Sequence, residues 1–183
     1  TGVVNNNTTL TSTGSYNYGL YSAGTVTNNA DINFGNGLGN VGIYSTYGGR
    51  ATNLAGRTVT VGASYKDPTN SLNDRYAVGM AAGFNGDGNP AKAYTGNIVN
   101  EGTINVTGKD SIGMYGTEAG TKVYNGTSKG STATINLKAN NTTGMYLDNE
   151  AYGYSYGTIK SVGSGLQALT GVVVKNGATF ENH

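Results

Sequence analysis

A stretch of alternating tyrosines and small residues carries the clearest binding chemistry in this chain, because Tyr152, Tyr154 and Tyr156 are separated by single glycine or serine residues. Residues two apart in an extended segment project to the same side, so the three rings are expected to form one flat aromatic face. Such rings stack on the apolar face of a sugar, and tyrosine is enriched at protein interfaces. Asp148 and Glu150 precede them as polar binding partners. The alternative is that the tyrosines pack on one another and only stabilise the structure.

Asp148 and Glu150 are also the one close pair of carboxylates that the sequence suggests. On a strand their side chains would lie about 6–7 Å apart, within the range that glycosidases use. No other acidic cluster supports this pair, the single histidine is His183, and no serine occupies a nucleophile elbow. The sequence therefore predicts no catalytic residue and no cofactor, and an enzyme that cleaves polysaccharides stays the alternative.

Three segments are expected to be inserted loops that interrupt a repeating pattern. They are residues 64–75, 85–94 and 118–129. Loops of this kind carry much of the variation, and often the binding residues, of repeat proteins. The loop residues Asp67, Arg75 and Lys122 are therefore predicted to contact a ligand, and the alternative is that these loops are solvated and mobile.

The sequence predicts no metal site. Residues 85–89, Asn-Gly-Asp-Gly-Asn, resemble part of a calcium loop, but the opening acidic residue and the closing glutamate are missing. The chain contains no cysteine, which excludes disulfides and thiolate zinc sites.

The candidate binding residues must be positioned by a repeating scaffold. A phrase of glycine, a bulky apolar residue and usually tyrosine recurs along the chain at steps of 21 to 37 residues. Its copies are Gly19-Leu20-Tyr21, Gly42-Ile43-Tyr44, Gly79-Met80-Ala81, Gly113-Met114-Tyr115, Gly144-Met145-Tyr146 and a degenerate Gly165-Leu166-Gln167. Such a period is typical of solenoids. The apolar members from Leu20 to Met145 are expected to form an inward row, with glycine and tyrosine on the opposite face. The repeated tyrosines are then structural.

Two further phrases run in phase with the first. One alternates apolar and small polar residues, as at residues 102–106, and the other places an apolar residue two positions before an asparagine, as in Val123-Tyr124-Asn125 and Val174-Lys175-Asn176. Alternation with period two indicates strands, and 31 glycines disfavour helices. We therefore expect an all-β chain of about six coils with three strands each. The asparagines at positions 28, 100, 125 and 176 are expected to stack as a ladder.

The composition of the chain limits its partners. Charged residues make up 11% and the net charge is +1, so no basic surface is expected to hold the phosphates of a nucleic acid. No run of 18 apolar residues predicts a membrane-spanning helix. The regular spacing of isoleucine, valine and tyrosine favours folding over disorder.

The segment Gly-Thr-Ile-Asn-Val-Thr-Gly-Lys-Asp-Ser-Ile-Gly-Met-Tyr at residues 102–115 resembles the coil repeat of passenger domains in large type V autotransporters, most closely fusobacterial outer-membrane adhesins. Residues 40–44 and 142–146 are similar, and the resemblance covers most of residues 20–180. It implies a right-handed parallel β-helix over residues 1–183, as a fragment of a longer passenger domain. It also implies display on the outer face of the bacterial outer membrane, through a C-terminal barrel that this sequence does not contain.

The resemblance further implies adhesion, with a surface protein or glycan of a host cell or another bacterium as the partner and with no catalytic step. Because a fold alone does not determine function, a second hypothesis stays open. The coils would then form a structural spacer that holds a distant binding tip away from the membrane. The expected loops favour adhesion, since a spacer needs none.

Overall fold

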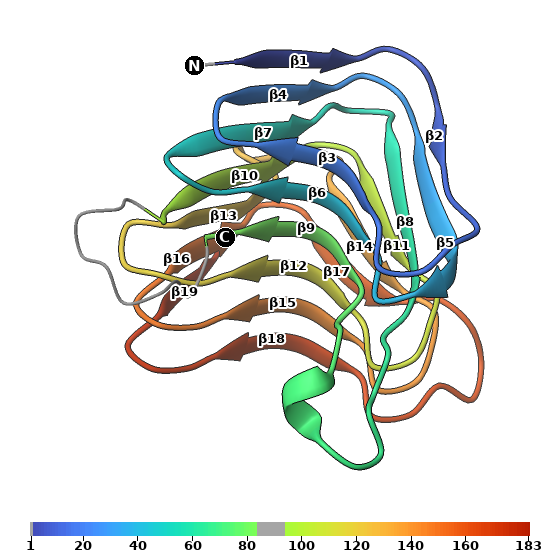
Figure 1. Ribbon diagram of the computed structural model, residues 1–183. Coiled ribbons are helices and arrows are strands. Elements are labelled where there is room, and N and C mark those ends of the chain that lie inside the picture. Colours follow the sequence, from blue (N-terminus) through green and yellow to red (C-terminus); the bar gives the residue numbers. More distant parts are fainter. Residues whose placement is uncertain (1, 84–93) are drawn as a thin grey trace.

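Successive turns of the chain stack on one another in the computed structural model, which describes residues 2–83 and 94–183 (Figure 1). Each turn adds one strand to each of three sheets, and neighbouring strands within a sheet are parallel and three elements apart in the chain. This connectivity is that of a parallel β-helix. The predicted all-β class and the solenoid of about six coils are confirmed.

The strands divide into sheets A, B and C. Sheet A contains β1 (Val3–Asn6), β4 (Thr25–Asn28), β7 (Gly49–Asn53), β10 (Gly96–Asn100), β13 (Lys122–Asn125), β16 (Tyr152–Ser155) and β19 (Thr179–Asn182). Sheet B contains β2 (Leu10–Thr11), β5 (Ile32–Leu38), β8 (Thr58–Ala63), β11 (Thr103–Val106), β14 (Thr134–Leu137) and β17 (Thr158–Ser161). Sheet C contains β3 (Tyr18–Ser22), β6 (Val41–Ser45), β9 (Val78–Ala82), β12 (Ile112–Gly116), β15 (Thr143–Leu147) and β18 (Thr170–Val174). The one helix in the described ranges is the 3-10 turn η1 (Ser71–Asn73).

Columns of isoleucine, valine and methionine fill the interior from coil to coil. In sheet B, Val59, Ile104 and Ile135 lie in register and are fully buried, while the alternate residues face outward as period two requires. In sheet C the predicted inward row is confirmed, with exposures of at most 8% at Leu20, Ile43, Met80, Met114 and Met145. Burial of each such side chain contributes about 1.5–3 kcal/mol, so every stacked coil adds to the stability of its neighbours.

The glycine that opens each sheet C phrase faces the interior, which corrects the prediction that it shares a face with the tyrosine. A Cβ on Gly113 would lie 2.6 Å from Cγ2 of Ile135 and 2.6 Å from the carbonyl oxygen of Gly144. Two consecutive residues, glycine and the bulky apolar residue, therefore turn inward. The side chains that flank this pair, such as those of Ile112 and Tyr115, pack together in a separate apolar cluster.

Buried asparagines near the ends of sheet A strands form the predicted ladder, but its membership differs. The side chains in the ladder are Asn6, Asn28, Asn53, Asn100, Asn125 and, at its end, Ser155. Each asparagine Nδ2 donates to the side-chain oxygen of the next member at 2.7–3.1 Å. The prediction for Asn176 was wrong, because this residue is exposed and follows β18 of sheet C.

The last coil departs from the predicted phrases. Gly165-Leu166-Gln167 precedes β18 and is not the sixth copy, because Val172 and Val173 pair with Met145 and Tyr146. Val174 ends β18, so Val174-Lys175-Asn176 is not a sheet A strand either. Valine replaces both the bulky residue and the tyrosine in this coil, which conceals the repeat.

Residues 64–77 leave the stack between β8 and β9, and they form the green excursion with η1 at the lower edge of Figure 1. An antiparallel bridge between Tyr65 and Arg75 closes its base. The prediction of an inserted loop at 118–129 was wrong, because this segment contains β13, which pairs in regular register with β10 and β16. Most of the predicted loop at 85–94, with the calcium-like residues 85–89, lies outside the described residues.

Candidate binding groove

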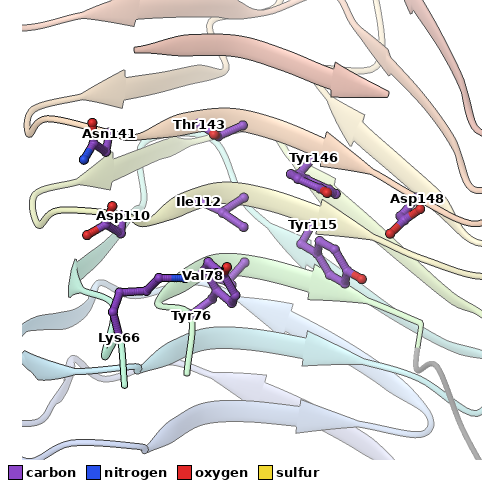
Figure 2. A pocket seen from close by; sticks show the side chains of 10 residues that line it. All are labelled: Lys66, Tyr76, Val78, Asp110, Ile112, Tyr115, Asn141, Thr143, Tyr146 and Asp148. Carbon is purple, nitrogen blue, oxygen red and sulfur yellow. Dashed lines mark hydrogen bonds between the residues drawn. The ribbon is translucent and has the colours of Figure 1, made fainter. Parts of the chain in front are cut away.

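A groove of about 540 Å³ crosses the outer face of sheet C beside the loop at residues 64–77. Its lining consists of Lys66, Tyr76, Val78, Asp110, Ile112, Tyr115, Asn141, Thr143, Tyr146 and Asp148. Figure 2 shows Asp110 and Asn141 on one side, the two sheet C tyrosines and Asp148 on the other, and Val78, Ile112 and Thr143 between them. In each strand of the lining the glycine and the methionine turn inward. No side chain therefore projects outward between the row of Val78, Ile112 and Thr143 and the row of tyrosines. This absence hollows the face.

Tyr115 and Tyr146 form the aromatic side of the groove. Their ring centroids are 5.8 Å apart, their planes differ by 42°, and both side chains are half-buried. They pack against an outer apolar cluster that includes Val78 and Ile112. Burial is the main cause that raises the pKa of Tyr115, and the charge of Asp148 raises it further. The phenol therefore stays neutral at physiological pH and can donate a hydrogen bond.

Asp110 and Asn141 hold equivalent turn positions two residues before β12 and β15. Both have a left-handed backbone, with φ of 60° and 56°, a conformation that aspartate and asparagine tolerate better than most residues. Within the described ranges, the carboxylate of Asp110, the amide of Asn141 and the hydroxyl of Thr143 make no hydrogen bond to the protein. Three polar groups on this side of the groove are therefore free for a ligand.

The loop closes one end of the groove with an ion pair. Lys66 Nζ donates to the Asp74 carboxylate and, at 2.7 Å, to Oη of Tyr76. The ammonium lies 4.3 Å from the centroid of the Tyr76 ring. The hydrogen bond between Lys66 and Asp74 raises the pKa of Lys66 and lowers that of Asp74. Both groups are therefore charged at neutral pH and compensate each other.

Ala81 interrupts the tyrosine row between Tyr44 and Tyr115 and adjoins a second hollow of about 260 Å³. Tyr44 lines this hollow, and its Oη donates to the carbonyl of Gly83 at 3.0 Å. Burial raises the pKa of Tyr44 to about 12. Tyr115 lines both hollows, so the recessed surface continues along sheet C past the groove.

The tyrosines that the sequence predicted as a binding face, Tyr152, Tyr154 and Tyr156, belong to sheet A and the residue after it, and they do not line the groove. Neighbouring rings meet edge to face, at 71° and 81°, so the predicted flat face is not formed. Tyr154 also stacks on Tyr124 at 4.0 Å, and Tyr156 stacks on His183 at 4.4 Å. Another ring therefore covers one face of Tyr154 and one face of Tyr156, which favours the structural alternative for these two residues.

The carboxylates predicted to share a strand face, Asp148 and Glu150, instead follow β15 in a turn. Asn149 and Glu150 have a left-handed backbone there, with φ of 48° and 62°, so the strand spacing assumed for a glycosidase pair is absent. Asp148 lines the groove, and its Oδ1 accepts hydrogen bonds from the backbone of Asn149 and from Nδ2 of Asn176. Glu150 is exposed and is not part of the lining.

The three charged residues predicted from the loops also lie outside the lining. Arg75 is exposed and donates to backbone carbonyls of its own loop. Lys122 is exposed at the start of β13. The carboxylate of Asp67 accepts hydrogen bonds within the loop, which hold its pKa well below the usual range; the donors are Thr69, Asn70 and Asn73. Asp67 therefore shapes the loop that borders the groove.

Sequence reasoning assigned Tyr115 and Tyr146 to structure and did not single out Asp110, Asn141 or Thr143. A signal was present, since an acidic or amide residue precedes the sheet C strand by two positions in both coils. The contribution of Lys66 and Tyr76 carried no comparable signal, because only the fold brings the loop beside coils that follow it in the chain.

Hydrogen bonding, ring stacking and charge are the chemistry that this groove offers. Among residues 2–83 and 94–183, no group of three or more histidine, cysteine, aspartate or glutamate side chains is arranged to hold a metal ion. No helix within the same ranges is both long and apolar enough to cross a membrane.

Residues 1–158 match the family model described as the BigA third pectate lyase-like domain. The matched segment contains every residue of the groove lining. No curated protein and no solved structure matches the chain. BigA domains occur in bacterial surface proteins, and the match agrees with the β-helical passenger architecture that the resemblance implied. With the match covering most of its length, the chain belongs to the family of the BigA third pectate lyase-like domain.

Proposed function

We propose that this domain is a noncatalytic adhesion module of a bacterial cell surface and that it binds surface glycans in the sheet C groove. One observation carries the proposal. Tyr115 and Tyr146 lie across the groove from Asp110 and Asn141, with Thr143 between the two sides, and the side chains of these three polar residues are free of hydrogen bonds to the described residues.

A sugar ring matches both sides of this groove. It presents an apolar C–H face that packs on tyrosine rings and a rim of hydroxyls that hydrogen-bond to carboxylate, amide and hydroxyl groups. The volume of about 540 Å³ lies within the range of small-ligand sites. The binding groups are on strands and tight turns of a stacked solenoid, so little ordering entropy is lost on binding.

The groove is shallow and open to solvent, so a single site is expected to bind weakly. Many copies on one cell would engage a glycan-coated surface together, and multivalency raises the overall avidity by orders of magnitude. Weak sites in many copies suit adhesion, because individual contacts exchange while the cell stays attached.

The proposal includes display on the outer face of the outer membrane, as part of a longer autotransporter passenger. Two observations support this location, namely the occurrence of the family in bacterial surface proteins and the coil phrase at residues 102–115. The sequence resemblance assigns attachment to a C-terminal barrel outside this chain.

The proposal includes no bond cleavage. Of the two carboxylates that the sequence offered as a glycosidase pair, only Asp148 reaches the groove, and Glu150 follows it in a turn that faces solvent. Asp148 and Asp110 approach from opposite sides of the lining (Figure 2), where each is placed to bind hydroxyls.

Binding of the purified domain to a glycan array, to epithelial cells and to other bacteria tests the proposal. The groove variant is Tyr115→Ala/Tyr146→Ala, and the matched control is Tyr152→Ala/Tyr154→Ala, which removes the same ring area from sheet A. We expect the groove variant to lose binding roughly ten-fold or more while the control keeps it. Circular dichroism of both variants checks that each is folded.

Three other outcomes count against the proposal. Loss of binding only in the sheet A variant would place the site on Tyr152 and Tyr154. Binding to cells from which surface glycans have been removed enzymatically would indicate a protein ligand. Absence of binding to every surface would favour the structural spacer.

A further inference from the structure

We infer that the groove selects glycans by charge: it prefers saccharides that carry free amino groups to uncharged ones, and it excludes saccharides rich in carboxylates. This inference rests on the proposed function, since it assumes that a glycan occupies the groove. The observation behind it is an imbalance among the charged side chains of the lining, namely Lys66, Asp110 and Asp148.

The one cation of the lining is already neutralised. Lys66 Nζ is bound to the Asp74 carboxylate and to Oη of Tyr76, and it lies over the Tyr76 ring. An incoming carboxylate would have to replace Asp74, which is held in place by a hydrogen bond from the backbone N–H of Asp67 at 2.9 Å. Lys66 therefore closes the end of the groove and offers little attraction to an acidic ligand.

The two carboxylates of the lining have no cationic partner among the described residues. Asp110 makes no side-chain hydrogen bond there, and the donors to Asp148 are the neutral amides of Asn149 and Asn176. Hydrogen bonds from neutral amides leave the negative charge of a carboxylate in place. Asp110 and Asp148 lie on opposite sides of the floor (Figure 2), so a bound ring experiences negative potential from both.

Lys175 lies near the aromatic side of the groove, outside the lining. Its Nζ lies 5.8 Å from the centroid of the Tyr146 ring, and its side chain is exposed. Within the lining itself, the two unpaired carboxylates face no unpaired cation.

The consequence differs for three classes of saccharide. A glucosamine oligomer can place the ammonium of one ring against Asp110 while a neighbouring ring keeps its apolar face on Tyr115 and Tyr146. A neutral sugar makes the same stacking contacts without the charge attraction. A polyuronate such as pectate brings a carboxylate on every ring, and like charges in a partly desolvated groove repel.

Three oligosaccharides of equal length test the inference in titrations with the intact domain at pH 6, where amino sugars are protonated. The probes are a glucosamine oligomer, an N-acetylglucosamine oligomer and a galacturonate oligomer. We expect the glucosamine oligomer to bind most tightly and the galacturonate oligomer to bind least. In Asp110→Asn, the advantage of the glucosamine over the N-acetylglucosamine oligomer is expected to shrink by about 2- to 5-fold. High salt should shrink it as well.

The outcomes separate this inference from the proposed function. Galacturonate binding that equals or exceeds glucosamine binding, and that Tyr115→Ala/Tyr146→Ala abolishes, overturns the charge selection and leaves the groove as a glycan site. An unchanged ratio in both Asp110→Asn and Asp148→Asn also overturns it. If none of the three probes binds, or if the tyrosine variant binds all three normally, the glycan groove and the charge selection both fail.

Discussion

At the scale of single residues, the glycines of sheet C are fixed by neighbours from two coils. A Cβ atom on Gly113 would lie 2.6 Å from Cγ2 of Ile135 in sheet B and 2.6 Å from the carbonyl oxygen of Gly144 in the next coil. Real Cβ atoms do not approach carbonyl oxygens so closely, and a backbone atom cannot move aside without moving its strand. Glycine here permits the coils to stack at normal strand spacing.

We therefore predict that Gly113→Ala destabilises the domain by about 1–3 kcal/mol through overpacking. Gly171→Ala is the matched control, because Gly171 holds the same position in the last coil and nothing lies within 4 Å of its Cβ position. Urea unfolding followed by circular dichroism measures both. Equal stability of the two variants would show that the stack absorbs a methyl group and would contradict the crowding argument.

Residue patterns alone predicted much of this interior. The inward row from Leu20 to Met145 and the ladder asparagines at 28, 100 and 125 were predicted, because burial and stacking repeat identical side chains in every coil. Asn176 was misassigned because an asparagine two residues after an apolar residue also follows a sheet C strand, and Asn6 and Asn53 were missed. Local spacing could not separate these positions. Only the pairing of strands does.

At the scale of elements, the excursion at residues 64–77 owes its shape to one carboxylate. Asp67 accepts hydrogen bonds from the backbone N–H groups of Thr69 and Asn70, the Thr69 hydroxyl and the Asn73 amide. Its own backbone N–H donates to Asp74, which pairs with Lys66 at the end of the groove. The order of the loop and the shape of the groove are therefore linked.

We predict that Asp67→Ala loosens this loop without unfolding the coils. At pH 7, hydrogen exchange at the Thr69 and Asn70 amides should be faster in Asp67→Ala than in the native protein, and Ser71→Ala, which leaves the hydrogen bonds of Asp67 intact, should behave as native. The folded loop lowers the pKa of Asp67, so its stabilisation is complete above the ordinary carboxyl pKa and is lost as the pH falls below about 4.

The native loop should accordingly lose protection progressively below that pH, after correction for intrinsic exchange, while Asp67→Ala shows no such loss. A pH response that is the same in both proteins would assign the order of the loop to other contacts, such as the bridge between Tyr65 and Arg75.

The candidate groove could be predicted from the sequence only in part. The tyrosines of β12 and β15 recur in register, which predicts a structural role for them, and the Asp/Asn positions before these strands were not singled out. Ala81 at the tyrosine position of β9 and the excursion that precedes β9 make this one coil differ from its neighbours, and that difference turns a uniform face into a groove. The alternation at residues 152–156 predicts a flat aromatic face of Tyr152, Tyr154 and Tyr156 instead. Local spacing does not show that these rings meet edge to face, or that Tyr154 and Tyr156 stack on other rings.

At the scale of the whole molecule, stability is expected to vary along the solenoid. The central core residues Ile104, Met114 and Ile135 are fully buried, whereas Val172 and Phe180 of the last turns are only partly buried. In a stacked array each coil is stabilised by its neighbours on both sides, so a coil with one neighbour opens at lower free energy.

We predict a gradient of hydrogen-exchange protection, highest in β8, β11 and β14 and lowest at both ends of the stack, in β1 and β2 and in β17, β18 and β19. Exchange measured by mass spectrometry on peptides from each coil gives this profile directly. Uniform protection over all coils would instead indicate a single cooperative unit that opens only by global unfolding.

Each sheet C strand places a glycine and the apolar residue after it in the interior, and this arrangement limits which positions of the outer face can change during evolution. Coil stacking depends on the glycine and its apolar neighbour in the interior, and the outward residues on either side of them pack in the separate outer apolar cluster. Under the proposed function, substitutions at the turn positions before each strand, such as Asp110 and Asn141, would change the binding face without altering the interior. A lineage under selection by changing host or microbial coats can revise its binding face one coil at a time on an unchanged scaffold.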